Sequence, residues 1–398
     1  MAESITNQEA LWGQWADQIR ACAADGQRLR IRGGGTKDFL GDPRGADQVL
    51  QTSDWRGIES YEPSELVIRV RAGTPLSEVE AVLASKGQYL AFEPPRYNWL
   101  AGGATTIGGV VAAGLSGPGR ISRGAVRDHV LGCTVLNGRG EVLRFGGAVM
   151  KNVAGFDVSR LMAGSMGTLG VLLDVTLKVM PQPVSTATLR IEMNEAEALA
   201  QVNQWAGQPI PLDASAWWDG MLVLRLRGAR AAVSGAVQRM YKERGGELIA
   251  PPLAERFWQG VRDHSDEFFE RARVAVDKGG AHGITLWRFA LPATAVPLGL
   301  PGEVMHEWFG AQRWVCTSAP ADTIHELAAK AGGHAMPFVS AQIRPMHEPR
   351  EVPAVMADLQ ARVQQAFDPA GVFLPSRKWA LSPNVSPHAS PDAASADA

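Results

Sequence analysis

Residues 105–109 read Thr-Thr-Ile-Gly-Gly and open a run of small residues that continues to Gly119. The same region closes with Lys-Asn-Val-Ala-Gly-Phe-Asp at 151–157 and Gly-Ser-Met-Gly-Thr-Leu-Gly at 164–170, between apolar, strand-like runs. Glycine at this density lets a main chain lie directly against a large flat or polyanionic ligand, because a Cβ would hold the backbone away. We therefore expect residues 105–171 to form one wall of a binding site for such a ligand.

A second glycine cluster follows an alternating, strand-like segment at residues 29–32. Gly33, Gly34 and Gly35 present consecutive backbone N–H groups that suit phosphate oxygens, and Arg32 and Lys37 add positive charge beside them. A glycine triplet alone would fit a flexible hairpin turn equally well. The glycines at 105–171 favour the phosphate-binding interpretation.

Length, composition and charge indicate a globular protein and give no sign of nucleic-acid binding. The chain has 398 residues, which predicts two domains, and 45% hydrophobic with 20% charged residues is typical of a globular protein. The formal net charge of −2 gives no support to nucleic-acid binding.

The three cysteines, Cys22, Cys133 and Cys316, lie far apart without a C-x-x-C pair, which argues against a metal or iron–sulfur site and a disulfide scaffold. Neither a signal-peptide pattern nor an apolar run of about 18 residues occurs, so we expect a cytoplasmic protein.

Periodicity and turn signals predict the regular elements. Thr74 is expected to cap a helix with Pro75 in its first position, and Asn137-Gly138 predicts a hairpin between strands at 129–136 and 141–145. Other expected strands are 29–32, 66–72, 171–179, 186–193, 217–226, 283–291 and 312–316. Other expected helices are 9–24, 195–205, 229–244, 323–330 and 353–367.

Common nucleotide and hydrolase motifs are absent. The chain contains no G-x-G-x-x-G, no Walker A lysine, no H-E-x-x-H and no G-x-S-x-G. Glycine clusters without these fingerprints indicate a fold that clamps a dinucleotide between loops of two small subdomains.

Taken together, the glycine segments resemble the flavin domain of the vanillyl-alcohol oxidase/p-cresol methylhydroxylase (PCMH) family. The matching motifs are R-G-x-G-T at 32–36, T-x-G-G followed by small residues at 106–117, and G-S-x-G-T-L-G-V at 164–171. The resemblance implies that loops at these motifs bind FAD. The implied FAD-binding residues are Arg32, Gly33, Gly34, Gly35, Thr36, Lys37, Thr106, Gly108, Gly109, Gly114, Ser116, Gly117, Asp128, Gly167, Gly170 and Val171.

Within that family, residues 149–161 are most similar to the flavoprotein subunits of bacterial glycolate oxidase, and the chain length favours the shorter, E-type subunit. This resemblance implies a larger D-type flavoprotein subunit and an iron–sulfur F-type subunit as partners, a small 2-hydroxy acid as substrate of the complex, and attachment to the inner membrane only through those partners. The first two motifs lack the His or Cys used for covalent attachment, so the FAD is expected to be non-covalent.

The chain departs from the D-type subunits in three ways. Met166 stands where those proteins usually have Glu, and neither the cap-domain H-x-G-D-G-N-x-H motif nor G-E-H-G-x-G is present. Near the end, residues 374–377 read Leu-Pro-Ser-Arg where the family usually has N-P-G-[KR]. The catalytic residues are therefore left unassigned, and no metal ligand is predicted. Possible carboxylate-binding residues are Arg225, Arg227, Arg288 and Arg344, although each also fits a structural salt bridge.

The expected fold class is α+β. Residues 1–181 should form a two-subdomain PCMH-type flavin domain and 182–352 an α+β cap, before a helix and return segment at 353–380 and a disordered tail at 381–398. The favoured function is an FAD-carrying subunit that supports oxidation of glycolate to glyoxylate and passes electrons to a partner carrier. Two alternatives stay open: a self-sufficient, D-lactate-like 2-hydroxy-acid dehydrogenase, and a structural partner subunit that has lost catalysis.

Overall fold

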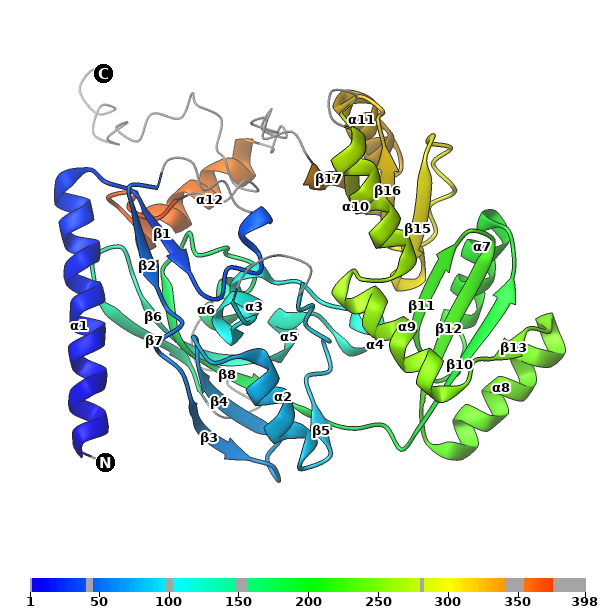
Figure 1. Cartoon of the computed structure of the whole chain (residues 1–398), viewed down its shortest axis with the longest axis horizontal. Coiled ribbons are helices and arrows are strands. Elements are labelled where there is room, and N and C mark those ends of the chain that lie inside the picture. The colour runs from blue at the N-terminus through cyan, green and yellow to red at the C-terminus, as the bar shows by residue number, and fades with distance from the viewer. Residues whose placement is uncertain are drawn as a thin grey trace, which may run out of the picture.

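A computed structural model describes residues 2–40, 46–97, 103–147, 157–279, 283–340 and 354–374 (Figure 1). Its two large sheets lie side by side, with α4 (Arg120–Arg123) and α9 (Pro251–Asp263) at the boundary between them. The predicted segment 381–398, Arg344 and most of the 149–161 motif lie outside the described residues. Among the residues described, no helix is long and apolar enough to cross a membrane.

The first sheet is five-stranded and antiparallel, in the order β3-β4-β8-β6-β7. The bounds are β3 Ile58–Glu62, β4 Val67–Arg71, β8 Val171–Lys178, β6 Val130–Leu136 and β7 Val142–Gly146. Strand β8 is buried almost throughout because its apolar side chains belong to two cores. One core contains α2 (Leu76–Ala84) and α3 (Ile107–Ala113), and the other contains α1 (Ala2–Asp25).

The strand before the glycine triplet belongs to a separate two-stranded sheet. Here β1 (Leu29–Arg32) pairs in parallel with β2 (Gln48–Gln51). The C-terminal segment returns to this strand, because the Leu29 amide donates to the Val372 carbonyl and the Leu374 amide donates to the Leu29 carbonyl. Helix α12 (Ala354–Phe367) leads into this segment and lies near β1 (Figure 1). The expected C-terminal return to the flavin domain is therefore present as far as residue 374.

The second sheet has eight antiparallel strands in the order β13-β10-β12-β11-β15-β16-β14-β17. The bounds are β13 Glu247–Leu248, β10 Ser185–Glu192, β12 Met221–Gly228, β11 Leu212–Trp218, β15 Glu303–Glu307, β16 Gln312–Thr317, β14 Thr285–Ala290 and β17 His334–Ser340. The remaining helices of this half are α7 Glu195–Ala206, α8 Arg230–Arg244, α10 Glu267–Gly279 and α11 Ala321–Lys330, with the 3-10 turn η3 Trp308–Gly310. The shorter elements of the first half are η1 Asp38–Leu40, β5 Gln88–Tyr89, α5 Val126–His129, α6 Val158–Met162 and β9 Met180–Pro181.

Two local predictions were wrong. The single strand expected at 217–226 is a hairpin, because Asp219 and Gly220 both adopt positive φ and turn the chain between β11 and β12. Thr74 does not cap α2: Pro75 occupies the N-cap position, and the Thr74 hydroxyl instead accepts from the Gly57 amide and donates to the Arg71 carbonyl. The hairpin at Asn137 is confirmed, since β6 and β7 pair in register around it.

Candidate functional site

A pocket opens where the glycine triplet meets α3 and the turn at Met166. The residues that line it are Leu29, Arg30, Ile31, Arg32, Gly33, Gly34, Gly35, Thr36, Lys37, Asp38, Thr106, Gly109, Ala112, Ala113, Met166, Gly167 and Leu374. All three sequence motifs therefore contribute to one pocket, although the first and the last lie more than a hundred residues apart along the chain.

Gly34, the middle residue of the glycine triplet, packs too closely against residues 103–104 to carry a side chain. The Gly103 amide donates to the Gly34 carbonyl at 2.8 Å, and a Cβ on Gly34 would lie 1.7 Å from the Ala104 carbonyl oxygen. Gly35 has φ +77°, a conformation that other residues rarely adopt. The main chain itself therefore forms this wall of the pocket.

The basic residues of the pocket differ in how they are paired. Asp38 accepts from Arg32 Nε at 2.8 Å and from Arg30 Nη2 at 2.6 Å, so it neutralises much of their charge. Lys37 has no ion pair with any carboxylate among the described residues; its ammonium lies 3.5 Å from the Thr36 hydroxyl. Burial lowers the pKa of Lys37 to about 8, with Asp263 opposing the shift in part. A half-buried cation without a counterion suits an anionic ligand.

The second glycine cluster, expected to be a loop, is largely the short helix α3. Its N-cap is Thr106, whose hydroxyl accepts from the Gly109 amide at 3.3 Å. The two adjacent glycines of this helix have different surroundings. A Cβ on Gly108 would lie 2.7 Å from the Ala72 Cβ, whereas a Cβ on Gly109 would meet only the Thr106 hydroxyl, at 3.2 Å. Gly108 thus allows α3 to pack on β4, and Gly109 lines the pocket.

Seven predicted FAD-binding residues lie outside the pocket lining: Gly108, Gly114, Ser116, Gly117, Asp128, Gly170 and Val171. Gly114 ends α3 at φ +63°, Ser116 accepts from the Val126 amide, and the Asp128 carboxylate accepts from the Ala125 amide. Val171 is fully buried in β8, and a Cβ on Gly170 would lie 2.6 Å from the Leu136 carbonyl oxygen. These contacts position the surrounding backbone; a direct FAD contact for these residues stays a prediction.

Several pocket residues were not anticipated. Met166 adopts φ +55°, unusual for a residue with a side chain, and its amide donates to the Ala112 carbonyl at 2.8 Å. Leu374 reaches the pocket through the C-terminal return. Met166 could have been found from its place inside the G-S-x-G motif, and Leu374 from its place in the predicted C-terminal return segment.

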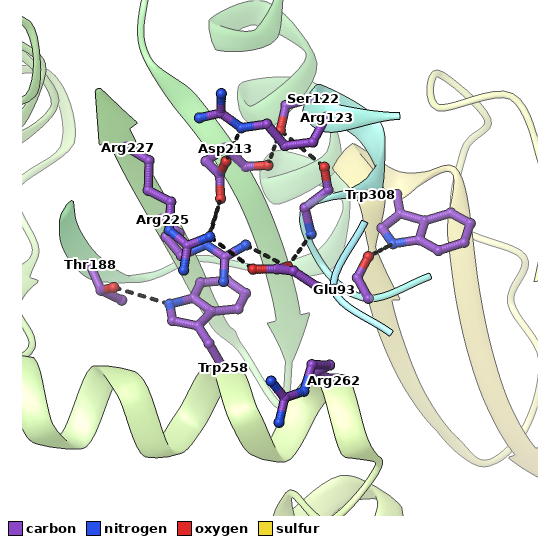
Figure 2. Close-up of polar contacts among 12 residues, drawn as sticks. Glu93, Ser122, Arg123, Thr188, Asp213, Arg225, Arg227, Trp258, Arg262 and Trp308 are labelled. Carbon is purple, nitrogen blue, oxygen red and sulfur yellow. Dashed lines mark hydrogen bonds and ion pairs between the residues drawn. The ribbon is translucent and has the colours of Figure 1, made fainter. Parts of the chain in front are cut away.

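A buried ion network joins the two halves of the chain (Figure 2). Glu93 accepts from Arg225 Nη2 and Arg227 Nη1, each at 2.8 Å, and from the Gly119 amide at 2.8 Å. Arg225 Nε also donates to Asp213 Oδ2 at 2.6 Å. Arg225 is 2% exposed and Asp213 1%. Two of the four predicted carboxylate-binding arginines, Arg225 and Arg227, are thus occupied by structural ion pairs.

Contacts around this network extend the junction. Arg123 Nε donates to Asp213 Oδ1 at 2.8 Å, and the Ser122 hydroxyl donates to the Asp213 carbonyl at 2.6 Å. Trp308 Nε1 donates to the Gly117 carbonyl at 3.0 Å. Gly117 and Gly119, at the end of the small-residue run, therefore contact the cap half of the molecule.

Comparisons with known proteins agree with the motifs. A family model described as an FAD binding domain matches residues 12–146. Glycolate oxidase subunit GlcE of Escherichia coli K12 is 40% identical over 366 residues, which cover 92% of this chain and 96% of that protein. The chain belongs to the GlcE family of glycolate oxidase subunits. Its FAD-binding domain places this GlcE-family chain among FAD-dependent oxidoreductases.

More distant relatives cover less of the chain. Glycolate oxidase subunit GlcD of Bacillus subtilis is 30% identical over 43% of this chain and 35% of its own length. A D-lactate dehydrogenase of Anaerostipes hadrus is 30% identical over 60% of this chain and 48% of its own. Among solved structures, an alkyldihydroxyacetonephosphate synthase aligns with a TM-score of 0.60 at 12% identity, covering 90% of this chain and 74% of that chain. This similarity confirms the PCMH-type fold class of the GlcE-family chain.

Proposed function

We propose that this chain is the FAD-carrying subunit of a glycolate oxidase complex and supports oxidation of glycolate to glyoxylate. The observation that carries the proposal is the 40% identity to Escherichia coli GlcE over nearly the full length of both chains. The pocket built from the three glycine motifs supplies the matching physical site.

The pocket suits FAD on three grounds. The main chain at Gly34 forms one wall of the pocket because no side chain would fit there. Lys37 offers a cation that has no ion pair among the described residues. Gly109 leaves the α3 wall without a projecting side chain. We propose that Arg32, Gly33, Gly34, Gly35, Thr36 and Lys37 hold the pyrophosphate, with Thr106, Gly109 and Gly167 opposite. The lining contains no His or Cys, which supports non-covalent binding.

Bound FAD would supply the redox chemistry, accepting a hydride equivalent and releasing electrons to another carrier. The protein's part is to bind and orient it. The backbone N–H groups of the glycine triplet would donate to phosphate oxygens, and the ammonium of Lys37 would offset their charge. Met166 and Leu374 would exclude water from the edges of the pocket, since both line it with apolar side chains.

We further propose the division of the chain and its partners. Residues 1–181 would form the flavin domain, 182–352 the cap and 353–380 the return segment. The relatives named GlcE and GlcD support a complex with a D-type flavoprotein subunit. The proposal also includes an F-type iron–sulfur subunit as electron acceptor. It places the chain in the cytoplasm, attached to the membrane only through its partners.

A self-sufficient 2-hydroxy-acid dehydrogenase is the second candidate, favoured by the similarity to D-lactate dehydrogenases. The purified chain should show a flavin absorbance spectrum that glycolate and D-lactate leave unbleached unless the D-type subunit is added. Bleaching of the isolated chain would replace the first candidate by the second. Purification of a colourless chain that gains no flavin spectrum on incubation with FAD would instead support the structural-partner alternative.

FAD affinity should fall as pH rises through about 8. The pyrophosphate keeps its charge over this range, whereas Lys37, with its pKa lowered to about 8 in the free protein, loses its proton. Loss of one charge-assisted hydrogen bond of about 1.5 kcal/mol predicts roughly tenfold weaker binding at about pH 9.5 than at about pH 7. Fluorescence titration of the apoprotein with FAD would measure this.

The Lys37→Met variant should bind FAD with the weaker, high-pH affinity at every pH. The exposed Lys86 lies in the first half of the chain but outside the pocket lining, so Lys86→Met is a matched control that should keep the wild-type profile. Parallel pH profiles for wild type and Lys37→Met would contradict the placement of Lys37 at the pyrophosphate.

A further inference from the structure

Two arginines from different halves of the molecule lie against one buried tryptophan. Trp308 is 5% exposed, and its ring centroid lies 4.5 Å from the guanidinium of Arg120 and 5.4 Å from that of Arg288. Arg120 comes from α4 and Arg288 from β14. The hydrogen bond from Trp308 Nε1 to the Gly117 carbonyl fixes the position of the ring that both guanidinium groups contact.

Neither arginine has a counterion among the described residues. Arg288 Nε donates to Gln312 Oε1 at 2.7 Å, and no hydrogen bond to a described residue uses its terminal nitrogens. By contrast, Arg71, Arg225 and Arg271 also lie against tryptophan rings, yet each has a carboxylate partner. Burial, aided by repulsion from neighbouring arginines, lowers the pKa of both Arg120 and Arg288. Two partly buried like charges with no carboxylate partner among the described residues favour binding of an anion.

Glu307 is close to this pair but does not neutralise it. Its Oε1 accepts from Trp314 Nε1 at 2.6 Å and from Gln312 Nε2 at 3.0 Å, so Gln312 stands between Glu307 and Arg288. No hydrogen bond to a described residue uses Oε2. Burial raises the pKa of Glu307 to about 7, although its hydrogen bonds and Arg288 oppose the shift. An oxygen that can accept a hydrogen bond therefore lies beside the arginines.

Aromatic contacts connect this cluster to the FAD-binding pocket. The ammonium of Lys37 lies 5.6 Å from the ring centroid of Tyr97, which is 5.0 Å from that of His264. His264 in turn lies 4.7 Å from Trp314, the donor to Glu307. Nδ1 of His264 is buried without a hydrogen-bond partner among the described residues. The cluster and the pocket are thus joined by a continuous series of contacts.

We propose that Arg120, Arg288 and Glu307 form a binding site for a small 2-hydroxy carboxylate. The two guanidinium groups hold the carboxylate, and Glu307 Oε2 accepts a hydrogen bond from the hydroxyl group. The anion site follows from the side-chain arrangement alone; the choice of a 2-hydroxy acid, among small carboxylates, rests on the proposed function. The Trp308 ring, which both arginines contact, forms the apolar floor.

Calorimetric titration of the FAD-loaded chain with glycolate, acetate and glycolamide tests the site without relying on turnover. Wild type should bind glycolate most tightly, acetate several-fold more weakly because it lacks the hydroxyl, and glycolamide not measurably because it lacks the charge. No heat of binding from glycolate, or equal affinity for glycolate and glycolamide, would overturn the proposal without any variant.

Variants test the named residues. Arg288→Met and Arg120→Met should each weaken glycolate binding by about 10- to 100-fold, as expected for loss of hydrogen bonds between charged groups. In Glu307→Gln the preference for glycolate over acetate should shrink. Arg271→Gln is the matched control, because Arg271 lies over Trp218 but is exposed and paired with Glu267; its affinity should equal that of wild type.

The same samples separate this proposal from the proposed function. Flavin absorbance and co-purification with the D-type subunit are recorded for each variant. Unchanged glycolate affinity in both arginine variants, with FAD and the D-type subunit retained, overturns the anion site alone. A wild-type chain that binds neither FAD nor the D-type subunit but still binds glycolate would overturn the proposed function and leave the anion site supported.

Discussion

Arg225→Met should lower the free energy of unfolding by about 3–5 kcal/mol, the usual cost of removing one member of a buried ion network. The substitution keeps an unbranched apolar side chain but removes the guanidinium, so Glu93 and Asp213 stay buried without the most buried of their shared partners. Chemical denaturation followed by tryptophan fluorescence would measure the loss. Arg239→Met is the matched control: Arg239 pairs with Glu243 on the exposed face of α8, so its loss should cost less than about 1 kcal/mol.

The same network predicts an acid-dependent loss of stability. Burial alone would raise the pKa of Glu93, but Arg225, Arg227 and the Gly119 amide lower it from 4.5 to about 2. A carboxylate with a lowered pKa stabilises the fold above about pH 4.5, and this contribution disappears as the pH falls toward 2. Wild type should therefore lose more stability than Arg225→Met between these values. Equal stability of the two proteins at neutral pH would contradict the role of the network.

Gly109→Val should yield a folded protein that no longer retains FAD. The valine side chain would project from α3 into the pocket and clash with bound FAD. A steric cost of about 3 kcal/mol to the binding free energy corresponds to an FAD affinity weaker by on the order of 100-fold. The fold should tolerate the change, because a Cβ at this position meets only the Thr106 hydroxyl and valine is no worse than glycine in a helix. The flavin-to-protein absorbance ratio after purification measures retention.

Gly235→Val provides the control for Gly109→Val. Gly235 also lies inside a helix, in α8, with no atom within 4 Å of its Cβ position and far from the pocket lining. It should keep the full flavin content of wild type. Full retention of FAD by Gly109→Val would contradict the assignment of α3 to the FAD site.

The sequence was most informative where the chemistry is local. The triplet Gly33–Gly35 and Gly167 were predicted to line one site, and they line one pocket, because close backbone approach requires glycine within a few residues. The hairpin at Asn137 followed from turn chemistry in the same way. Helix α9 was missed although Ala254, Trp258 and Val261 have helical spacing and are buried in the structure. That omission was avoidable.

Other features were beyond local reasoning. Glu93 and Arg225 are 132 residues apart, and nothing near either one indicates the other. From the sequence, Arg288 could not be distinguished from a structural arginine. Only the structure shows that it has no carboxylate partner among the residues described, whereas Arg225 and Arg227 each have one. Pairing across two sheets depends on the tertiary arrangement, which neither periodicity nor motif spacing contains.

The return of the C-terminal segment to β1 has a consequence for the order of events during synthesis. The hydrogen-bond partners of Leu29, Val372 and Leu374, are made some 340 residues after it. Because Leu374 also lines the pocket, the ribosome must pass residue 374 before the cofactor site is closed. Contacts between such distant parts of a chain form slowly. FAD is therefore expected to bind only after residue 374 has been made, and a chain truncated before Val372 should be released from the ribosome without FAD.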